Sequence, residues 1–194
     1  MRTTEAFRLD GARAPVTGAS RGIGRAVALA PADAGVDRAL SARTEEALKD
    51  TALEVAQRHR AAHLVLMSSV AGVIGTPMME AYAATKAGRT SLARSLAVGW
   101  ARDGVRVNAR CPGWTRTDMT AFAQRSAPVS DWLTAHAPLG RRAEPEEAAW
   151  AALHLASPAA GCLTGQALVV DGGLSVPDSG LAGIPEPSSP SAGV

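Results

Sequence analysis

The sequence predicts an α/β fold in which a parallel sheet is covered by helices on both faces. Short apolar runs alternate with longer helical patterns along most of the chain, as in folds of this class. A glycine-rich turn, residues 17–24, separates the first apolar run from the first helical pattern. The 194 residues, 46% apolar and 20% charged, suit one globular domain of ordinary composition.

The first part of the chain supplies three strands and two helices. The apolar run 14–17 leads into the glycine turn, and the helical pattern 23–34 follows it. A second strand is expected at 38–42. Thr44 then provides an N-cap with acids in the first turn, which predicts a helix ending near Arg58. The continuous apolar run HLVLM, 63–67, predicts a buried strand.

The second part adds two helices and two strands. Residues 80–102 form a long helical pattern rich in Ala, Gly and Ser, which suits close packing against a neighbour. The strand expected at 105–109 is ended by the triplet Cys-Pro-Gly. Residues 114–139 are predicted to be a loop-rich insertion with helical parts. A helix with Pro near its start is expected at 145–156, and a last strand at 167–170.

Composition sets the domain boundaries and the classes of partner. Residues 1–176 are expected to form the domain, and 177–194 a disordered tail dominated by Pro, Ser and Gly. The net charge of +2 comes from scattered arginines, and aromatics are few, so no nucleic-acid partner is expected. No apolar stretch is long enough to span a bilayer, and no apolar leader begins the chain, which indicates a soluble cytoplasmic protein without a membrane partner.

The two cysteines and four histidines predict no metal site. Cys111 and Cys162 form no CxxC motif and no ligand cluster with the histidines. Two buried thiols in a reducing compartment are the better interpretation.

The single tyrosine of the chain, Tyr82, stands four residues before Lys86. On a helix these two side chains share a face. A nearby ammonium favours the phenolate and lowers a tyrosine pKa that is otherwise about 10, which makes the phenol a usable general acid or base. Taken alone, a YxxxK pattern is more often a surface tyrosine with a solvated lysine.

Two further motifs lie where ligands bind in open α/β sheets, beyond the carboxyl ends of the strands. The turn T-G-A-S-R-G-I-G, 17–24, lets the backbone approach a pyrophosphate at a helix N-terminus, although its spacing also fits a tight turn with a helix cap. Ser68 and Ser69 end the HLVLM strand and are expected to face the crevice. Ser69 precedes Tyr82 by 13 residues.

Taken together and in order, these motifs resemble the short-chain dehydrogenase/reductase family, particularly its 3-oxoacyl-carrier-protein reductase and sugar dehydrogenase types. The set is completed by N-A-R-C-P-G, 108–113, and by T-G-Q with V-D-G-G, 164–173. The resemblance extends from Phe7 to Val176. It implies a Rossmann-like doubly wound parallel sheet, a small carbonyl or alcohol substrate, and a homodimer or homotetramer.

The resemblance also implies roles for individual residues. Tyr82 would be the proton donor or acceptor, Lys86 would lower its pKa and hold the nicotinamide ribose, and Ser69 would hydrogen-bond the substrate carbonyl. Two further sets would contact the cofactor. The pyrophosphate and adenine-ribose side would be lined by Gly18, Ser20, Arg21, Gly22, Ile23 and Gly24, and the nicotinamide by Pro112, Gly113, Thr115 and Thr117.

The residues after the second strand favour NADP(H) over NAD(H). An NAD enzyme of this fold places an acid there for the ribose hydroxyls. Here the stretch reads S-A-R-T, with Arg43 where a 2′-phosphate would sit and Arg21 close by in the glycine turn. The alternative is that Arg43 is simply solvated.

One departure from the family leaves two function classes open. Only 26 residues separate Arg43 from Ser69, too few for the two further βα units that the family places there, so a sheet shortened to about five strands is expected. We expect the 63–67 strand to close the gap by pairing directly with 14–17, although Pro15 weakens that ladder. The chain is then either a working reductase with a reduced sheet or a non-catalytic remnant that at most binds nucleotide weakly.

Overall fold

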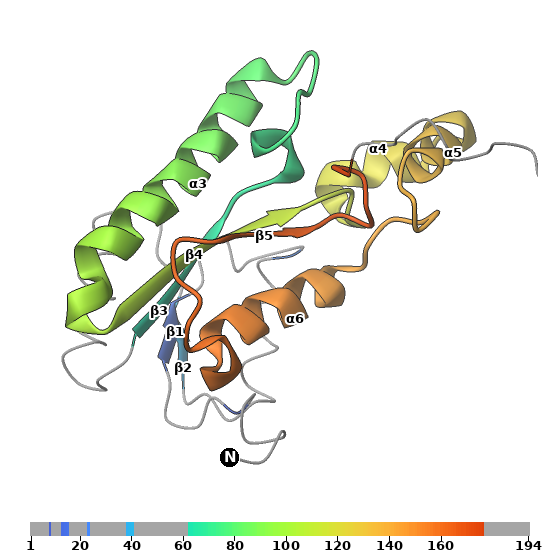
Figure 1. The fold of residues 1–194 in the computed structure, drawn as a ribbon. Helices are drawn as coiled ribbons and strands as arrows, with labels where there is room; N and C mark the ends of the chain where they lie inside the picture. The colour runs from blue at the N-terminus through green and yellow to red at the C-terminus, as the bar shows by residue number, and fades with distance from the viewer. Residues whose placement is uncertain (1–7, 9–12, 16–22, 24–37, 41–61, 177–194) are drawn as a thin grey trace, which may run out of the picture.

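A computed structural model describes residues 8, 13–15, 23, 38–40 and 62–176 of the chain (Figure 1). The helices expected at 23–34 and 45–58 and the tail expected at 177–194 lie outside these residues, except for Ile23, which is helical.

The described residues form five strands, all in parallel pairs, which confirms the predicted α/β class. The strands β3 (Ala62–Met67), β4 (Val105–Pro112) and β5 (Ala167–Val170) form one sheet in the order β3-β4-β5. The short strands β1 (Arg13–Pro15) and β2 (Arg38–Leu40) pair with each other.

The expected closure of the sheet is wrong for the described residues. Within the described strands, β1 pairs only with β2 and β3 only with β4, so no ladder joins residues 13–15 to residues 62–67. The composition of β1 accounts for this. It has three residues, and Pro15 has no N–H to give to a second ladder. The five strands therefore form groups of two and three.

The helix α3 (Glu80–Trp100) covers one face of the three-stranded sheet, as its small residues predict. Ala93 and Ala97 are buried against Val105 and Val107 of β4, with Leu64 of β3 in the same cluster. Small side chains on the helix let it approach the strands closely. The turn η3 (Ala101–Asp103) then ends the helix at a left-handed glycine, from which β4 begins.

The helix α6 (Pro145–Ala156) lies on the opposite side of the same sheet (Figure 1). Its bounds agree with those expected, because Pro145 suits the first helical turn and Glu144 and Glu147 form a capping box. Between β4 and α6 lie short elements of the predicted insertion, η4 (Asp118–Thr120), α4 (Ala121–Gln124) and α5 (Ala127–Ala135). The remaining short turns are η2 (Val70–Gly72) and η5 (Pro158–Ala160).

The strand β4 is longer than expected. It continues through Cys111 and Pro112, where the sequence predicts a strand end. Pro112 is tolerated because it is the last residue of the strand, and Gly113 N donates to Val170 O at 3.0 Å in its place. The carboxyl end of β4 therefore reaches further toward the loop that follows.

A fully buried arginine occupies the α6 side of the sheet. Arg110 of β4 is 0% exposed, donates from Nη1 to Ala148 O, and contacts Met67 Sδ with Nη2 at 2.7 Å. Its Nε has no hydrogen-bond partner, and no carboxylate of the described residues pairs with it. Burial lowers the pKa of the Arg110 guanidinium to about 10. The core therefore holds a charge that is only partly compensated.

Replacing this charge by an apolar side chain of similar length should stabilise the protein. We expect Arg110→Met to raise the free energy of unfolding by about 1–4 kcal/mol, the range found when buried ionic groups are exchanged for packed apolar ones. Urea denaturation followed by circular dichroism measures it. Arg94→Met, at an exposed position on α3, is the control and should change stability little. A lower stability of Arg110→Met would mean that the guanidinium is satisfied by other groups.

Candidate functional site

Ser69 is the second residue after the carboxyl end of β3. Ser69 is the N-cap of η2, and its Oγ accepts a hydrogen bond from Ala71 N at 3.2 Å. This bond fixes the hydroxyl oxygen. The hydroxyl hydrogen is donated to none of the described residues and remains available to an acceptor on a ligand.

Tyr82 and Lys86 lie on one face of α3, as their spacing predicts. The Lys86 Nζ is 5.3 Å from the centre of the Tyr82 ring. Both side chains are half-buried, and the Tyr82 hydroxyl makes no hydrogen bond to a described residue. The first two turns of α3 thus present a phenol and an ammonium together at the end of the sheet.

Ser68 has a different position from the one the sequence predicts. It is expected to face the crevice, but it is 1% exposed and donates from Oγ to Lys86 O at 2.7 Å. Thr90 Oγ1 donates in turn to Ser68 Oγ at 3.0 Å. Ser68 and Thr90 therefore attach α3 to the end of β3 at the residue that carries the ammonium.

A glycine brings η2 against the same turn of α3. A Cβ on Gly72 would lie 2.7 Å from Ala87 N and 2.8 Å from Lys86 C. No other residue fits at this approach without movement of the helix backbone. The contact keeps Ser69, three residues earlier, at a fixed distance from Lys86.

Lys86 lies in an environment that disfavours its charge. Burial is the main cause that lowers its pKa to about 8, and the nearby Arg89 guanidinium lowers it further, while Cys111 acts in the opposite direction. The ammonium donates to Met67 O at 3.3 Å. Its remaining hydrogens are available to a ligand such as a ribose hydroxyl.

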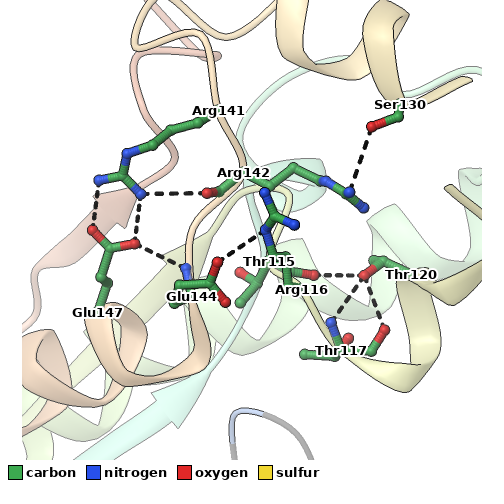
Figure 2. Close-up of polar contacts among 9 residues, drawn as sticks. All are labelled: Thr115, Arg116, Thr117, Thr120, Ser130, Arg141, Arg142, Glu144 and Glu147. Carbon is green, nitrogen blue, oxygen red and sulfur yellow. Dashed lines mark hydrogen bonds and ion pairs between the residues drawn. The ribbon is translucent and has the colours of Figure 1, made fainter. Parts of the chain in front are cut away.

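The segment expected to contact nicotinamide follows β4. Gly113 lies so close to β5 that a Cβ would stand 2.7 Å from Asp171 Cα. Thr115 Oγ1 donates to Gly113 O at 3.2 Å, and Thr120 Oγ1 donates to Thr115 O at 2.6 Å and accepts from Thr117 N at 3.1 Å (Figure 2). The loop from Pro112 to Thr117 is therefore held by its own hydroxyl groups.

One ion pair connects this loop to the start of α6, and a second lies within residues 141–147. Arg116 Nε is 2.9 Å from Glu144 Oε1, and the Arg141 guanidinium makes a bidentate pair with Glu147 at 2.7 Å (Figure 2). The backbone also connects the loop to the segment before α6, because Thr115 and Ala143 form an isolated parallel bridge. These contacts hold residues 113–117 beside the carboxyl end of β4.

The residues expected at the pyrophosphate lie outside the described part of the chain. This applies to Arg43 and to every named member of the glycine turn except Ile23, namely Gly18, Ser20, Arg21, Gly22 and Gly24. The structure brings together Tyr82 and Lys86, places Ser69 at the start of η2 and orders the 112–117 loop. Contact between these groups and the glycine turn stays a prediction.

Sequence reasoning missed two residues of the site, misplaced Ser68 and left out the role of Asn108. Arg89 and Thr90 follow Lys86 by three and four residues, so their helical spacing could have indicated that they lie beside it. Asn108, noted only as part of a motif, donates to Leu163 O at 2.9 Å and accepts from Gln166 N at 3.0 Å. The N-A-R-C-P-G and T-G-Q motifs are thus joined by a hydrogen bond between Asn108 and Gln166.

The described residues contain neither a cluster of metal ligands nor a membrane-spanning helix. Within 62–176 and the shorter described stretches, no three His, Cys, Asp or Glu side chains are placed to hold a metal ion. Among the helices described there, none has the length and apolar character needed to cross a membrane.

The family described as enoyl-(acyl carrier protein) reductase matches residues 52–175 of this chain. An uncharacterized short-chain type dehydrogenase/reductase of Sinorhizobium fredii is 44% identical over 133 residues, which are 68% of this chain and 24% of that protein. The oxidoreductase UcpA of Escherichia coli O157:H7 is 42% identical over 62% of this chain and 49% of its own length. The chain thus spans between a quarter and a half of these curated relatives.

The fold is also similar to solved structures. A gluconate 5-dehydrogenase from Burkholderia cenocepacia, in complex with NADP and tartrate, superposes with a TM-score of 0.76 at 26% identity. The match covers 89% of this chain and 98% of that one. The doubly wound, Rossmann-like arrangement expected from the motifs is confirmed by this similarity.

The close approach at Gly72 predicts a local effect of a single methyl group. Gly72→Ala should destabilise the protein by about 1–3 kcal/mol, because the Cβ meets helix backbone rather than a flexible side chain. Gly75→Ala is the matched control, since no atom lies within 4 Å of its Cβ position. Thermal unfolding of both variants measures the difference. Equal stabilities would show that η2 does not press on α3 at this point.

Proposed function

We propose that this chain, which belongs to the short-chain dehydrogenase/reductase family, is an NADP(H)-dependent oxidoreductase that interconverts a carbonyl and a secondary alcohol. One observation carries the proposal. The phenol of Tyr82 and the ammonium of Lys86 lie together on the first two turns of α3, and Ser69 caps η2, which packs against the same part of α3 through Gly72. A carbonyl that accepts hydride needs a hydrogen-bond donor and a proton source at its oxygen.

Each of the three side chains has a task in the reduction direction. Ser69, whose oxygen is fixed by Ala71 N, donates its hydrogen to the substrate oxygen. Tyr82 transfers its phenolic proton to that oxygen as negative charge develops on it. Lys86 stabilises the resulting phenolate through its charge. In the oxidation direction the same proton returns from the alcohol to Tyr82.

The donor groups of the described residues fit a nicotinamide cofactor. Reduced nicotinamide, when bound, supplies the hydride for the carbonyl carbon. Lys86 holds one acceptor, Met67 O, and has further hydrogens to offer to ribose hydroxyls. Pro112, Gly113, Thr115 and Thr117 lie in the ordered loop at the carboxyl end of β4.

NADP(H) is favoured over NAD(H) by charge. Arg21 and Arg43 are placed by the motifs at the adenine ribose, and no acid follows the second strand. The Burkholderia cenocepacia dehydrogenase was solved with NADP. This similarity supports the same cofactor here. The substrate is a small carbonyl compound or alcohol, and the family assembles as homodimers or homotetramers.

A non-catalytic remnant is the second candidate. Two observations favour it, namely that the chain spans less than half of its curated relatives and that no ladder joins the described β1 residues to β3. Such a protein would bind nucleotide weakly and turn over nothing. The reading frame of the adjacent DNA and NADPH binding by the purified chain separate the two candidates.

Tyr82→Phe tests the assigned proton donor. It removes the phenolic hydroxyl alone, so carbonyl-dependent NADPH oxidation should fall at least about 100-fold while NADPH affinity changes little. Thr85→Ala is the control, because Thr85 is exposed on the next turn and bonds only Ala81 O. Near-normal rates in Tyr82→Phe would exclude the assignment.

Arg43→Ala tests the cofactor preference. Loss of an arginine–phosphate pair costs about 1.5–3 kcal/mol, so the preference for NADPH over NADH should narrow about tenfold or more. Fluorescence titration with both cofactors measures it, with Arg94→Ala as the control. Equal affinities of the unmodified protein for NADPH and NADH would refute the preference.

A further inference from the structure

Two cationic side chains of α3 share one backbone acceptor beside the proposed site. Lys86 Nζ donates to Met67 O at 3.3 Å, and Arg89 Nη1 donates to the same oxygen at 2.9 Å. Because both distances end on one atom, the two nitrogens are at most about 6 Å apart. Like charges one helical turn apart repel each other.

The shared oxygen lies on the edge of β3 that faces away from β4. Ser68 N donates to Arg110 O of β4 at 2.8 Å. The Met67 carbonyl belongs to the same trans peptide group as this N–H, and the two bonds point in opposite directions. The Met67 carbonyl therefore points away from β4. Among the described residues, side chains of α3 donate to this carbonyl. In an inner strand of a sheet, the backbone of a neighbouring strand would donate to it instead.

We propose that Arg89 is a positioning residue for Lys86: its permanent charge, held on the carbonyl that Lys86 also uses, lowers the highest pH at which Lys86 remains an ammonium. The consequence for turnover rests on the proposed function. Arginine stays protonated at every pH of interest, whereas lysine loses its proton readily when buried. The protonation of Lys86 therefore depends on the charge of Arg89.

Among the described residues, few other charged or titratable groups surround Lys86. Tyr82 faces it from the same helix, and Cys111 faces it from β4. Arg110 is directed to the α6 side of the sheet, where it contacts Ala148. Burial and Arg89 both lower the pKa of Lys86, which is about 8, and Cys111 raises it. The ammonium that stabilises a Tyr82 phenolate would thus be present below about pH 8 and lost above it.

The composition of the chain makes this titration measurable. Lys86 and Lys49 are the only lysines in the sequence. Competitive acetylation with acetic anhydride over a pH series, read by peptide mass spectrometry, follows the two amines separately. The measurement needs neither cofactor nor turnover.

Arg89→Gln, which removes the charge, should raise the pKa of Lys86 by about half a unit to one unit. Arg89→Lys keeps a charge at this position and should leave the pKa of Lys86 close to that of the unmodified protein. Arg94→Gln, at an exposed site further along α3, is the matched control and should have no effect. In the unmodified protein, 1 M salt should raise the Lys86 pKa in the same direction by screening.

Two results separate this inference from the proposed function. An unchanged Lys86 pKa in Arg89→Gln, together with no salt effect, would overturn the role of Arg89 whatever the activity. A raised pKa supports it even in a chain without turnover, in which case only the proposed function fails. Where turnover is present, the pH at which kcat/KM falls on the alkaline side should rise in Arg89→Gln together with the Lys86 pKa measured by acetylation. In Arg89→Lys this pH should return to its value in the unmodified protein.

Discussion

The packing of α3 on the β3–β4 pair positions Tyr82 and Lys86. Ala93 and Ala97 allow the helix to approach Val107 closely, and the hydrogen bond from Ser68 to the Lys86 carbonyl fixes the position of the helix along the strand. Tyr82 is carried by the first turn of this helix. A shift of α3 would change the distance from the phenol to Ser69, and reacting groups tolerate little misplacement.

Much of the described part could be predicted, because its boundaries have local causes. The α6 limits follow from Pro145 and its capping acids, and β3 and β5 follow from continuous apolar runs. The Tyr82–Lys86 pair is a consequence of helical periodicity alone. Where the structure is determined by residues within about four positions of each other, pattern and geometry agree.

The remainder depends on tertiary contacts that no local pattern encodes. Ser68 could face the crevice or the helix, and only the position of Lys86 O decides between them. Nothing in the sequence distinguishes the buried Arg110 from an arginine on the surface. The expected closure of β1 on β3 failed for a similar reason, since pairing needs donors along a whole strand and β1 offers three residues with one proline.

A dehydrogenase of this fold must meet two requirements together, the geometry of its proton-transfer groups and their distance from the glycine turn, and these depend on different parts of the structure. The internal geometry of Ser69, Tyr82 and Lys86 depends on β3, η2 and α3, which are continuous in the sequence from 62 to 100. The distance from these groups to the glycine turn depends on how β1 is placed against β3, and in longer sheets an intervening strand fixes that placement. A chain can therefore keep the proposed proton-transfer groups in register while the position of the glycine turn, where the motifs predict cofactor binding, is determined separately. Since hydride transfer requires both, the placement of β1 relative to β3 decides whether Ser69, Tyr82 and Lys86 can act as proposed.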